Sequence, residues 1–443
     1  MLCCAVRTVP HLIGMALKAF VGEEVGAKRG RPWGVRGIDC MDLGDQLGSG
    51  TFGVVYKALD NGVPVALKKI KMERQSQGFP VTSIREMKIL KTLKHDNIVM
   101  LHDIITFNKE GEGNEYEQKG IADGDIFMVF EYVDYDLFGV LKSPSVKLTS
   151  MHIRSYMKQL LSGVESMHRA GILHRDIKSA NILVTSDNVI KIADWGLARL
   201  FHKENTRMTK EVCTLWYRSP ELLMGVKTYG PEIDIWSVGC IFGEIVARQA
   251  ILPGDSVARQ LELVQQLCGT PTGELRSKYE KMLDWDKYPF TTEHPPRLRR
   301  RFENFDALGV SFMEKLLDLD FSTRITAKDA IEDEFFFLES VGGQKRLVDL
   351  PRPQDLPRFG NIEFPREGDS KRKDEETRAR LRAEAELAEM AAAAAAAAAV
   401  QAAAHVAAGL GSIPMKRKSS QNLSKYKVIG PDDEGEEGEV ADN

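Results

Sequence analysis

"HRDIKSAN" (174–181) and "KIADWGLARL" (191–200) are the two short segments that decide the fold of this chain. Asp176 carries a carboxylate that can accept the proton of a substrate hydroxyl group. Asn181 and Asp194 provide oxygen ligands of the kind that Mg²⁺ prefers, and together they can hold two such ions against phosphates. Phosphoryl transfer needs positioned groups and neutralised charge more than it needs covalent chemistry from the protein. The two segments therefore predict that reaction.

A glycine-rich turn lies upstream, in "GSGTFGVV" (48–55). Apolar residues alternate on both sides of it, which predicts a hairpin whose backbone N–H groups can approach phosphate oxygens without interference from a Cβ atom. Lys68 in "VALKK" supplies a cation for the α- and β-phosphates. Glu86 lies on a helix predicted over residues 80–94 and can reach back to fix Lys68. The order of these features along the chain indicates a nucleotide-binding site.

The apolar periodicity predicts two lobes with a cleft between them. Strand patterns dominate residues 40–70 and 125–133, whereas helical spacing dominates after residue 150, over 151–169, 234–247, 257–268 and 308–318. We expect a disordered leader at 1–37 and a catalytic domain at 38–340, with lobes at about 38–133 and 134–340. Composition then predicts a Pro-rich and basic extension at 341–373, an Ala-rich helix at 374–410 and a basic, then acidic, disordered tail at 411–443.

Composition excludes several other classes of protein. A net charge of −4 argues against nucleic-acid binding through overall charge. The six cysteines show no metal-ligand spacing, which is typical of free thiols in a reducing compartment. Residues 390–413 are long enough to cross a bilayer but consist mostly of alanine, so we expect no membrane span. The basic "KRGRP" (28–32) is expected to be a solvated linker rather than a direct DNA contact.

The motifs as a set resemble those of the eukaryotic protein kinases, over about residues 33–340. The resemblance implies an α+β, bilobal fold with a small β-rich N-lobe, a larger α-helical C-lobe, and ATP with Mg²⁺ in the cleft. The backbone of the hinge near Glu131 and Val133 would pair with adenine, and Glu221 in "SPE" would pair with Arg324. The implied ATP-binding residues are Leu47, Gly48, Ser49, Gly50, Thr51, Phe52, Gly53, Val54, Val55, Lys68, Glu86, Glu131 and Val133.

Trp195 departs from this family, which usually has Phe between the Asp and the Gly of this motif. Either an active kinase accepts the larger ring, or the chain is a kinase-shaped scaffold that binds a cyclin with little or no catalysis. The residue would stack with Leu90, Leu101 and His174, and overpacking typically costs about 1–3 kcal/mol. Every residue with a catalytic or metal-binding role is present, so we interpret Trp195 as a packing variant of an active kinase.

Further segments resemble the cyclin-dependent kinases. Lys178 beside Asp176 resembles the catalytic loop of Ser/Thr-specific members, and "FPVTSIREMKIL" (79–90) occupies the place of their cyclin-binding helix. Thr209 would be the activation-loop phosphosite of an activating kinase, and its phosphate would order the loop through charge-assisted hydrogen bonds. The residues expected to coordinate that phosphate are Arg85, Arg175 and Arg199.

The substrate platform is expected at Val212 and Cys213, where Arg218 would hold the backbone in a strained turn. In that turn the loop carbonyl points towards Arg218, so the N–H after the acceptor residue of a substrate would be left without a partner. An unpaired N–H costs about 1–3 kcal/mol. Proline has no N–H to lose. The resemblance therefore predicts phosphorylation of Ser-Pro and Thr-Pro sites.

Segments around the glycine-rich turn and in "QLELVQQLCGTP" (260–271) resemble the transcription-elongation branch. That branch pairs with K- or T-type cyclins and phosphorylates the C-terminal repeat of RNA polymerase II. The helix "VTSIRE" (81–86) also resembles a splicing-associated relative, and a cell-cycle kinase is a further alternative. The basic "KRK" (371–373) and "MKRKSS" (415–420) suit nuclear import, so we expect the protein in the nucleus.

Overall fold

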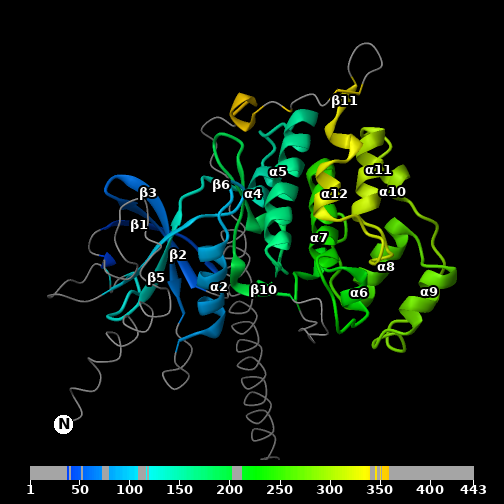
Figure 1. The fold of residues 1–443 in the computed structure, drawn as a ribbon, viewed down its shortest axis with the longest axis horizontal. Helices are drawn as coiled ribbons and strands as arrows, with labels where there is room; N and C mark the ends of the chain where they lie inside the picture. Colours follow the sequence, from blue (N-terminus) through cyan, green and yellow to red (C-terminus); the bar gives the residue numbers. More distant parts are fainter. Residues whose placement is uncertain are drawn as a thin grey trace, which may run out of the picture. The chain divides into compact units, whose positions relative to one another are not determined.

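A five-stranded antiparallel sheet forms the N-terminal part of the fold, drawn in blue to cyan in Figure 1. Its strands lie in the order β1-β2-β3-β5-β4. Their bounds are Met41–Gly50 for β1, Gly53–Asp60 for β2, Val63–Ile70 for β3, Leu101–Thr106 for β4 and Ile126–Glu131 for β5. At the start of β2 only glycine fits, because a Cβ on Gly53 would lie 2.1 Å from the carbonyl oxygen of Lys69.

A computed structural model provides these coordinates. It describes residues 37–38, 41–50, 53–71, 79–107, 116, 119–201, 212–339, 345–346, 350 and 352–358. The predicted leader, the Ala-rich segment and the basic and acidic tail lie outside these ranges, apart from residue 37. The predicted domain boundaries stay predictions.

Helix α2 (Val81–Thr92) contains a single carboxylate residue, Glu86, and this residue is buried. Its apolar residues Met87, Ile89 and Leu90 are buried at the spacing that predicted a helix over 80–94. Glu86 is only 2% exposed on the same helix. A buried carboxylate needs a partner, which here is Lys68 on β3.

The segment that leads into β5 is anchored on one face of the sheet. Ile121 is buried with Tyr56 and Phe127 in a common apolar cluster. The Tyr56 hydroxyl donates to the carbonyl of Lys119 (2.8 Å), and Lys119 Nζ donates to the carbonyl of Leu43 (2.9 Å). The segment between β4 and β5 therefore supports β1, the strand that leads into the glycine-rich turn.

The C-terminal part is helical, shown from teal through green to yellow in Figure 1. The helix α7 (Glu232–Ala247) is buried along nearly its whole length, and α5 (Ser150–Arg169) begins with a capping box between Thr149 and His152. The other helices are α4 (Leu137–Lys142), α6 (Pro220–Leu223), α8 (Val257–Cys268), α9 (Gly273–Glu280), α10 (Leu298–Arg301), α11 (Ala307–Leu316) and α12 (Ala327–Ile331). The predicted α+β class, with a β-rich half followed by a helical half, is confirmed.

Short strands position the catalytic segments between these two parts. Strands β6 (Tyr135–Asp136), β8 (Ile182–Val184) and β9 (Ile190–Ile192) form one small sheet, and β7 (Ile172–Leu173) pairs with β10 (Arg199–Leu200). A second pair joins β11 (Leu338–Glu339) and β12 (Lys345–Arg346). The segments 174–181 and 191–200 are thereby held at both ends.

Residues 352–358 pack back onto the helical part. Leu356 is buried, and the carbonyl of Pro357 lies 3.1 Å from His152 Nε2. Arg358 forms an ion pair with Asp187 (2.6 Å). Across the described ranges, no helix has the length and apolar character needed to cross a membrane, and residues 390–413 lie outside those ranges.

Candidate active site

Lys68, Glu86 and Asp194 converge from three separate elements. Lys68 Nζ lies 2.8 Å from Glu86 Oε1 and 3.2 Å from Asp194 Oδ1. Burial disfavours the Lys68 cation, but the two carboxylates outweigh that effect and raise the pKa of Lys68. Burial likewise works against the Asp194 carboxylate, and the Lys68 cation nevertheless holds the pKa of Asp194 below its ordinary value. The site thus holds a fixed cation beside an ionised carboxylate.

Asp176 is held by neighbours at both carboxylate oxygens. Lys178 Nζ lies 3.2 Å from Oδ2, and Asn181 Nδ2 donates to the same oxygen (3.1 Å). The backbone N–H and the hydroxyl of Thr214 both donate to Oδ1, at 3.1 and 3.0 Å. This arrangement orients a carboxylate that can accept a proton from a bound hydroxyl. The sequence interpretation included Lys178 and Asn181 but missed Thr214.

The predicted metal ligands Asn181 and Asp194 lie in neighbouring segments. The N–H of Ala193 donates to the carbonyl of Asn181 (2.9 Å), which brings the residue before Asp194 against Asn181. Within the described ranges no group of three or more His, Cys, Asp or Glu residues could hold a metal ion. An amide and a carboxylate fit Mg²⁺, because this ion is commonly bound by one or two carboxylates together with substrate phosphates. Their role as ligands stays a prediction.

Trp195 is completely buried beside the catalytic loop. Its indole N–H donates to the carbonyl of Ile192 (3.2 Å), and its ring packs edge-on against His174 with 4.8 Å between centroids. Leu90 and Leu101 belong to the same apolar core. The predicted contact between His174 and Trp195 is therefore present, with one hydrogen bond that a phenylalanine could not make.

Asp234 supports the catalytic loop from α7. Its carboxylate accepts hydrogen bonds from the backbone N–H groups of His174 (3.0 Å) and Arg175 (2.9 Å), and it also contacts His168 Nε2 (2.9 Å). Arg175 has φ +67°, a backbone conformation that needs such external support. The sequence interpretation missed Asp234. The available signal was a carboxylate among the apolar residues Ile233, Ile235 and Trp236 near the start of this helix.

Of the three arginines predicted to bind a phosphate, Arg175 and Arg199 lie near enough to Arg85 for their charges to affect it. Burial lowers the pKa of Arg85, and the like charges of Arg175 and Arg199 lower it further. Arg175 is fixed through Nε to the carbonyl of Leu197 (2.8 Å) and through Nη1 to the hydroxyl of Tyr229 (3.0 Å). Thr209 lies outside the described residues, so its phosphorylation stays a prediction.

The substrate platform contains the predicted contact with Arg218. Its Nε donates to the carbonyl of Val212 (2.8 Å) and its Nη2 to the carbonyl of Cys213 (2.9 Å). Cys213 has φ +63°, in the left-handed region, and its N–H donates to the carbonyl of Arg175 (2.8 Å). The platform turn is thus strained, and it is hydrogen-bonded to Arg175, one of the three arginines predicted to bind a phosphate.

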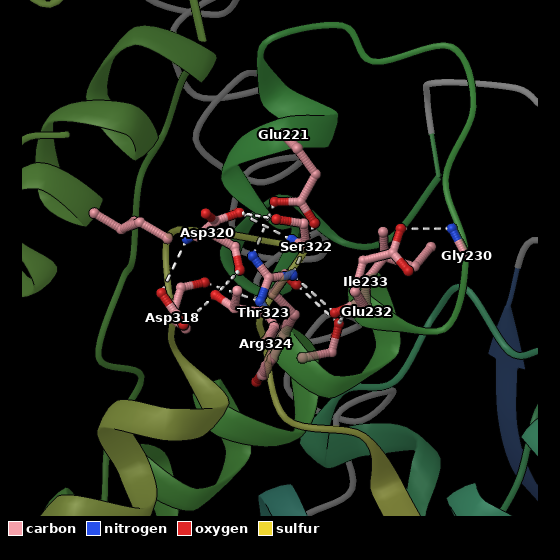
Figure 2. A network of polar contacts seen from close by, with 12 residues as sticks. Glu221, Gly230, Glu232, Ile233, Asp318, Asp320, Ser322, Thr323 and Arg324 are labelled. Atoms are coloured by element: carbon pink, nitrogen blue, oxygen red, sulfur yellow. Dashed lines mark hydrogen bonds and ion pairs between the residues drawn. The ribbon is translucent and has the colours of Figure 1, made fainter. Parts of the chain in front are cut away.

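Figure 2 shows the network of polar contacts around Arg324, which includes Glu221 in the segment that follows the platform. Arg324 forms a bidentate pair with Glu221, at 2.8 and 3.0 Å, as the sequence predicts. Arg324 also donates to the carbonyls of Glu232 (2.8 Å) and Asp318 (2.9 Å). Both side chains of the pair are buried, so each charge depends on the other.

The nucleotide-binding residues are only partly described. Val55 on β2 pairs in register with Lys68 on β3, while Val54 follows Gly53 on the same strand. Gly48 faces open space at its missing Cβ. Leu47 is described, but Thr51, Phe52 and the side chain of Ser49 are not.

The predicted hinge follows directly at the end of β5. The N–H of Glu131 donates to the carbonyl of Met100 (3.0 Å). A contact between adenine and the backbone of Glu131 would therefore use the Glu131 carbonyl. The Glu131 carboxylate is engaged by the N–H of Met100 (2.7 Å) and by Lys191 Nζ (3.0 Å). Val133 is buried just beyond the strand. The adenine contacts themselves stay predictions.

Comparison with known proteins agrees with this geometry. The family model of the protein kinase domain matches residues 41–336. Cyclin-dependent kinase C-1 of Arabidopsis thaliana is 43% identical over 317 residues, which cover 70% of this chain and 62% of that protein. Cyclin-dependent kinase 12 of Drosophila melanogaster is 41% identical over 305 residues, covering 68% of this chain and 26% of that protein.

Cyclin-dependent kinase 9 of Xenopus tropicalis is 40% identical over 319 residues, which cover 70% of this chain and 81% of that protein. The chain spans about three fifths of the length of the plant relatives, from 61 to 63%. The matched region contains Lys68, Asp176 and Asp194. The chain belongs to the protein kinase family and, within it, to the cyclin-dependent kinases.

Proposed function

We propose that this chain is a cyclin-dependent protein kinase that transfers the γ-phosphate of ATP to Ser-Pro and Thr-Pro sites. The observation that carries the proposal is the convergence of Lys68, Glu86 and Asp194 within 3.2 Å beside an oriented Asp176. The charges are those that phosphoryl transfer requires, namely a cation for phosphates, a carboxylate for a metal ion and a carboxylate for a hydroxyl proton.

Each of these residues has a defined task in the proposed reaction. Lys68 binds the α- and β-phosphates, and Glu86 keeps its ammonium group in place. Asn181 and Asp194 would hold Mg²⁺, which neutralises phosphate charge when bound. Asp176 accepts the proton of the attacking serine or threonine hydroxyl, and Lys178 beside it contacts the phosphate being transferred.

Substrate selection is proposed to come from the platform turn. The Val212 and Cys213 carbonyls are both engaged by Arg218, so neither is available to a substrate N–H. A residue with an N–H after the acceptor would lose a hydrogen bond on binding, whereas proline would not. This geometry favours proline-directed substrates.

The partner is proposed to be a cyclin of the K or T type, bound at α2. The names of the matched relatives, cyclin-dependent kinases C, 9 and 12, support a cyclin as partner. The role in transcription elongation rests on the resemblance of segments such as residues 260–271 to that branch. The substrate would be the C-terminal repeat of RNA polymerase II, and an activating kinase would phosphorylate Thr209. A nuclear location follows from this role and from the basic segments at 371–373 and 415–420.

Reconstitution tests this branch assignment. The purified chain is mixed with a K-type, a T-type or a cell-cycle cyclin, and phosphate transfer is measured on a heptad-repeat peptide. We expect transfer with a K- or T-type cyclin and little with the cell-cycle cyclin. Preference for the cell-cycle cyclin would contradict the branch, and no transfer with any cyclin would favour the scaffold alternative.

A further inference from the structure

The indole of Trp195 makes a hydrogen bond that connects three segments around the site. Its N–H donates to the carbonyl of Ile192 (3.2 Å) at the end of β9. The same carbonyl accepts the N–H of Val99 (3.0 Å), and the N–H of Ile192 donates to the carbonyl of Asn97 (2.9 Å). Trp195 is therefore bonded to a backbone junction that is itself fixed on both sides.

The residues on both sides of Asp194 are held by hydrogen bonds. On its N-terminal side, Ala193 donates to the carbonyl of Asn181 (2.9 Å), and the carbonyl of Ala193 lies 3.0 Å from His174 Nε2. On its C-terminal side, the N–H of Ala198 donates to the carbonyl of Trp195 (3.0 Å). Asp194 itself has φ +60°. A residue other than glycine keeps that conformation only where its surroundings impose it.

A second tryptophan shows that this bond does not follow from burial alone. Trp236 is as completely buried as Trp195, yet its Nε1 has no hydrogen-bond partner among the described residues. The bond of Trp195 is thus a property of its position beside Ile192. Moving the indole away would leave a buried N–H and a carbonyl with fewer partners, which is unfavourable. A phenylalanine ring at this position would lose only packing.

We propose that Trp195 is a positioning residue for Asp194. Its hydrogen bond to Ile192 restrains the Asp194–Leu197 segment in the conformation that directs Asp194 at Lys68, and it lowers the population of conformations in which the ring leaves its pocket. The importance of this restraint for catalysis rests on the proposed function, in which Asp194 binds a metal ion. The restraint itself is a property of the fold.

The test separates the hydrogen bond from the volume of the ring. Trp195 is replaced by 3-benzothienylalanine, which keeps the bicyclic shape but has sulfur in place of the N–H, and in a second chain by phenylalanine. Hydrogen exchange of the Ala193 and Ala198 amides is then measured in the full chain, because both amides are bonded only while the segment is in place. Loss of one hydrogen bond is expected to speed exchange about two- to tenfold.

Trp236→Phe is the matched control, because it removes an equally buried indole that makes no hydrogen bond. We expect unchanged exchange at Ala193 and Ala198 in this variant. In phosphate-transfer assays Trp195→Phe should remain active, with a modest loss of stability from the smaller ring and a KM for Mg·ATP raised severalfold. Trp236→Phe should leave that KM unchanged.

The benzothienylalanine chain decides the proposal. Faster exchange at both amides supports it, and exchange equal to that of the unmodified chain overturns it. The exchange measurement requires neither a cyclin nor a substrate. Failure of phosphate transfer in every chain would therefore contradict the proposed function, whereas the restraint is supported or overturned by the exchange rates alone.

Discussion

The guanidinium of Arg218 donates to the carbonyl of Cys213 across 2.9 Å, and Cys213 has a left-handed backbone with φ +63°. The two features depend on each other, since the strained turn directs the carbonyl at the arginine and the hydrogen bond offsets the strain. The carbonyl is thus directed at Arg218, which is the basis of the proposed selection against a substrate N–H after the acceptor residue.

Proline dependence is the first consequence. Matched peptides that carry Ser-Pro or Ser-Ala are expected to differ about ten- to a hundredfold in kcat/KM, because the Ser-Ala peptide leaves an N–H unpaired. Arg218→Lys replaces the planar fork that donates from Nε and Nη2 by a single ammonium group, so it should lower that ratio towards one. Arg259→Lys, at an exposed arginine paired with Glu262, is the control and should keep the ratio. Equal rates on both peptides with the unmodified chain would contradict the platform argument.

Activation through Thr209 can be tested by changing Thr209 itself and one of the three arginines predicted to bind its phosphate. Burial lowers the pKa of Arg85, and the charges of Arg175 and Arg199 lower it further, so a phosphate among the three would relieve repulsion on Arg85. Thr209→Ala should therefore lower activity even with cyclin bound. Arg85→Ala should cause a similar defect, and the double variant should add little to either single change. An alanine variant at Thr209 with the full activity of the phosphorylated chain would exclude this mechanism.

The buried pair of Glu221 and Arg324 should contribute strongly to stability. Glu221→Gln leaves the Arg324 charge buried without its partner, and a loss of about 3–5 kcal/mol in the free energy of unfolding is expected. The control is Glu314→Gln, because Glu314 pairs with an exposed Arg299. That change should cost less than about 1 kcal/mol. Similar losses in denaturant unfolding of the two variants would contradict the role assigned to the buried pair.

The lowered pKa of Asp234 predicts how the stability of the fold depends on pH in acid. Burial works against its carboxylate, but hydrogen bonds from His168 and from the Arg175 N–H hold the pKa of Asp234 below its ordinary value of 3.8. The carboxylate thus stabilises the fold above that ordinary value, and this contribution is lost as pH falls through the lower folded value. Asp234→Asn should lose about 2–3 kcal/mol at neutral pH and show a shallower decline below pH 4. An unchanged acid profile would argue against this carboxylate as a support of the catalytic loop.

The sequence was sufficient to predict that Glu86 pairs with Lys68, whereas the contacts of the site residues with nucleotide and phosphate stay predictions. Lys68, Asp176 and Asp194 are recognisable because their chemistry is needed at fixed places relative to strands and turns. Thr214 and Asp234 were missed because they act through the backbone and side chains of the catalytic loop, and their contacts depend on how distant segments meet. Both became visible only when the hydrogen bonds to Asp176 and to His174 were known.

The consequence of Trp195 was also only partly predictable. Its burial followed from the motif, whereas its hydrogen bond depends on where the carbonyl of Ile192 points. The same limit applied to the arginines, whose proximity was predicted by resemblance and is seen in their mutual effect on the pKa of Arg85.

The most direct measurement of the central claim compares ATP binding and phosphate transfer in the unmodified chain and in Asp176→Asn, each with a K- or T-type cyclin. Asp176 is held by Lys178 and Thr214 and is not part of the group around Lys68. ATP affinity should therefore remain within a few-fold, while transfer to a Ser-Pro peptide should fall by about a hundredfold or more. Retention of most of the transfer activity by Asp176→Asn would contradict the account of this chain as a protein kinase that uses Asp176.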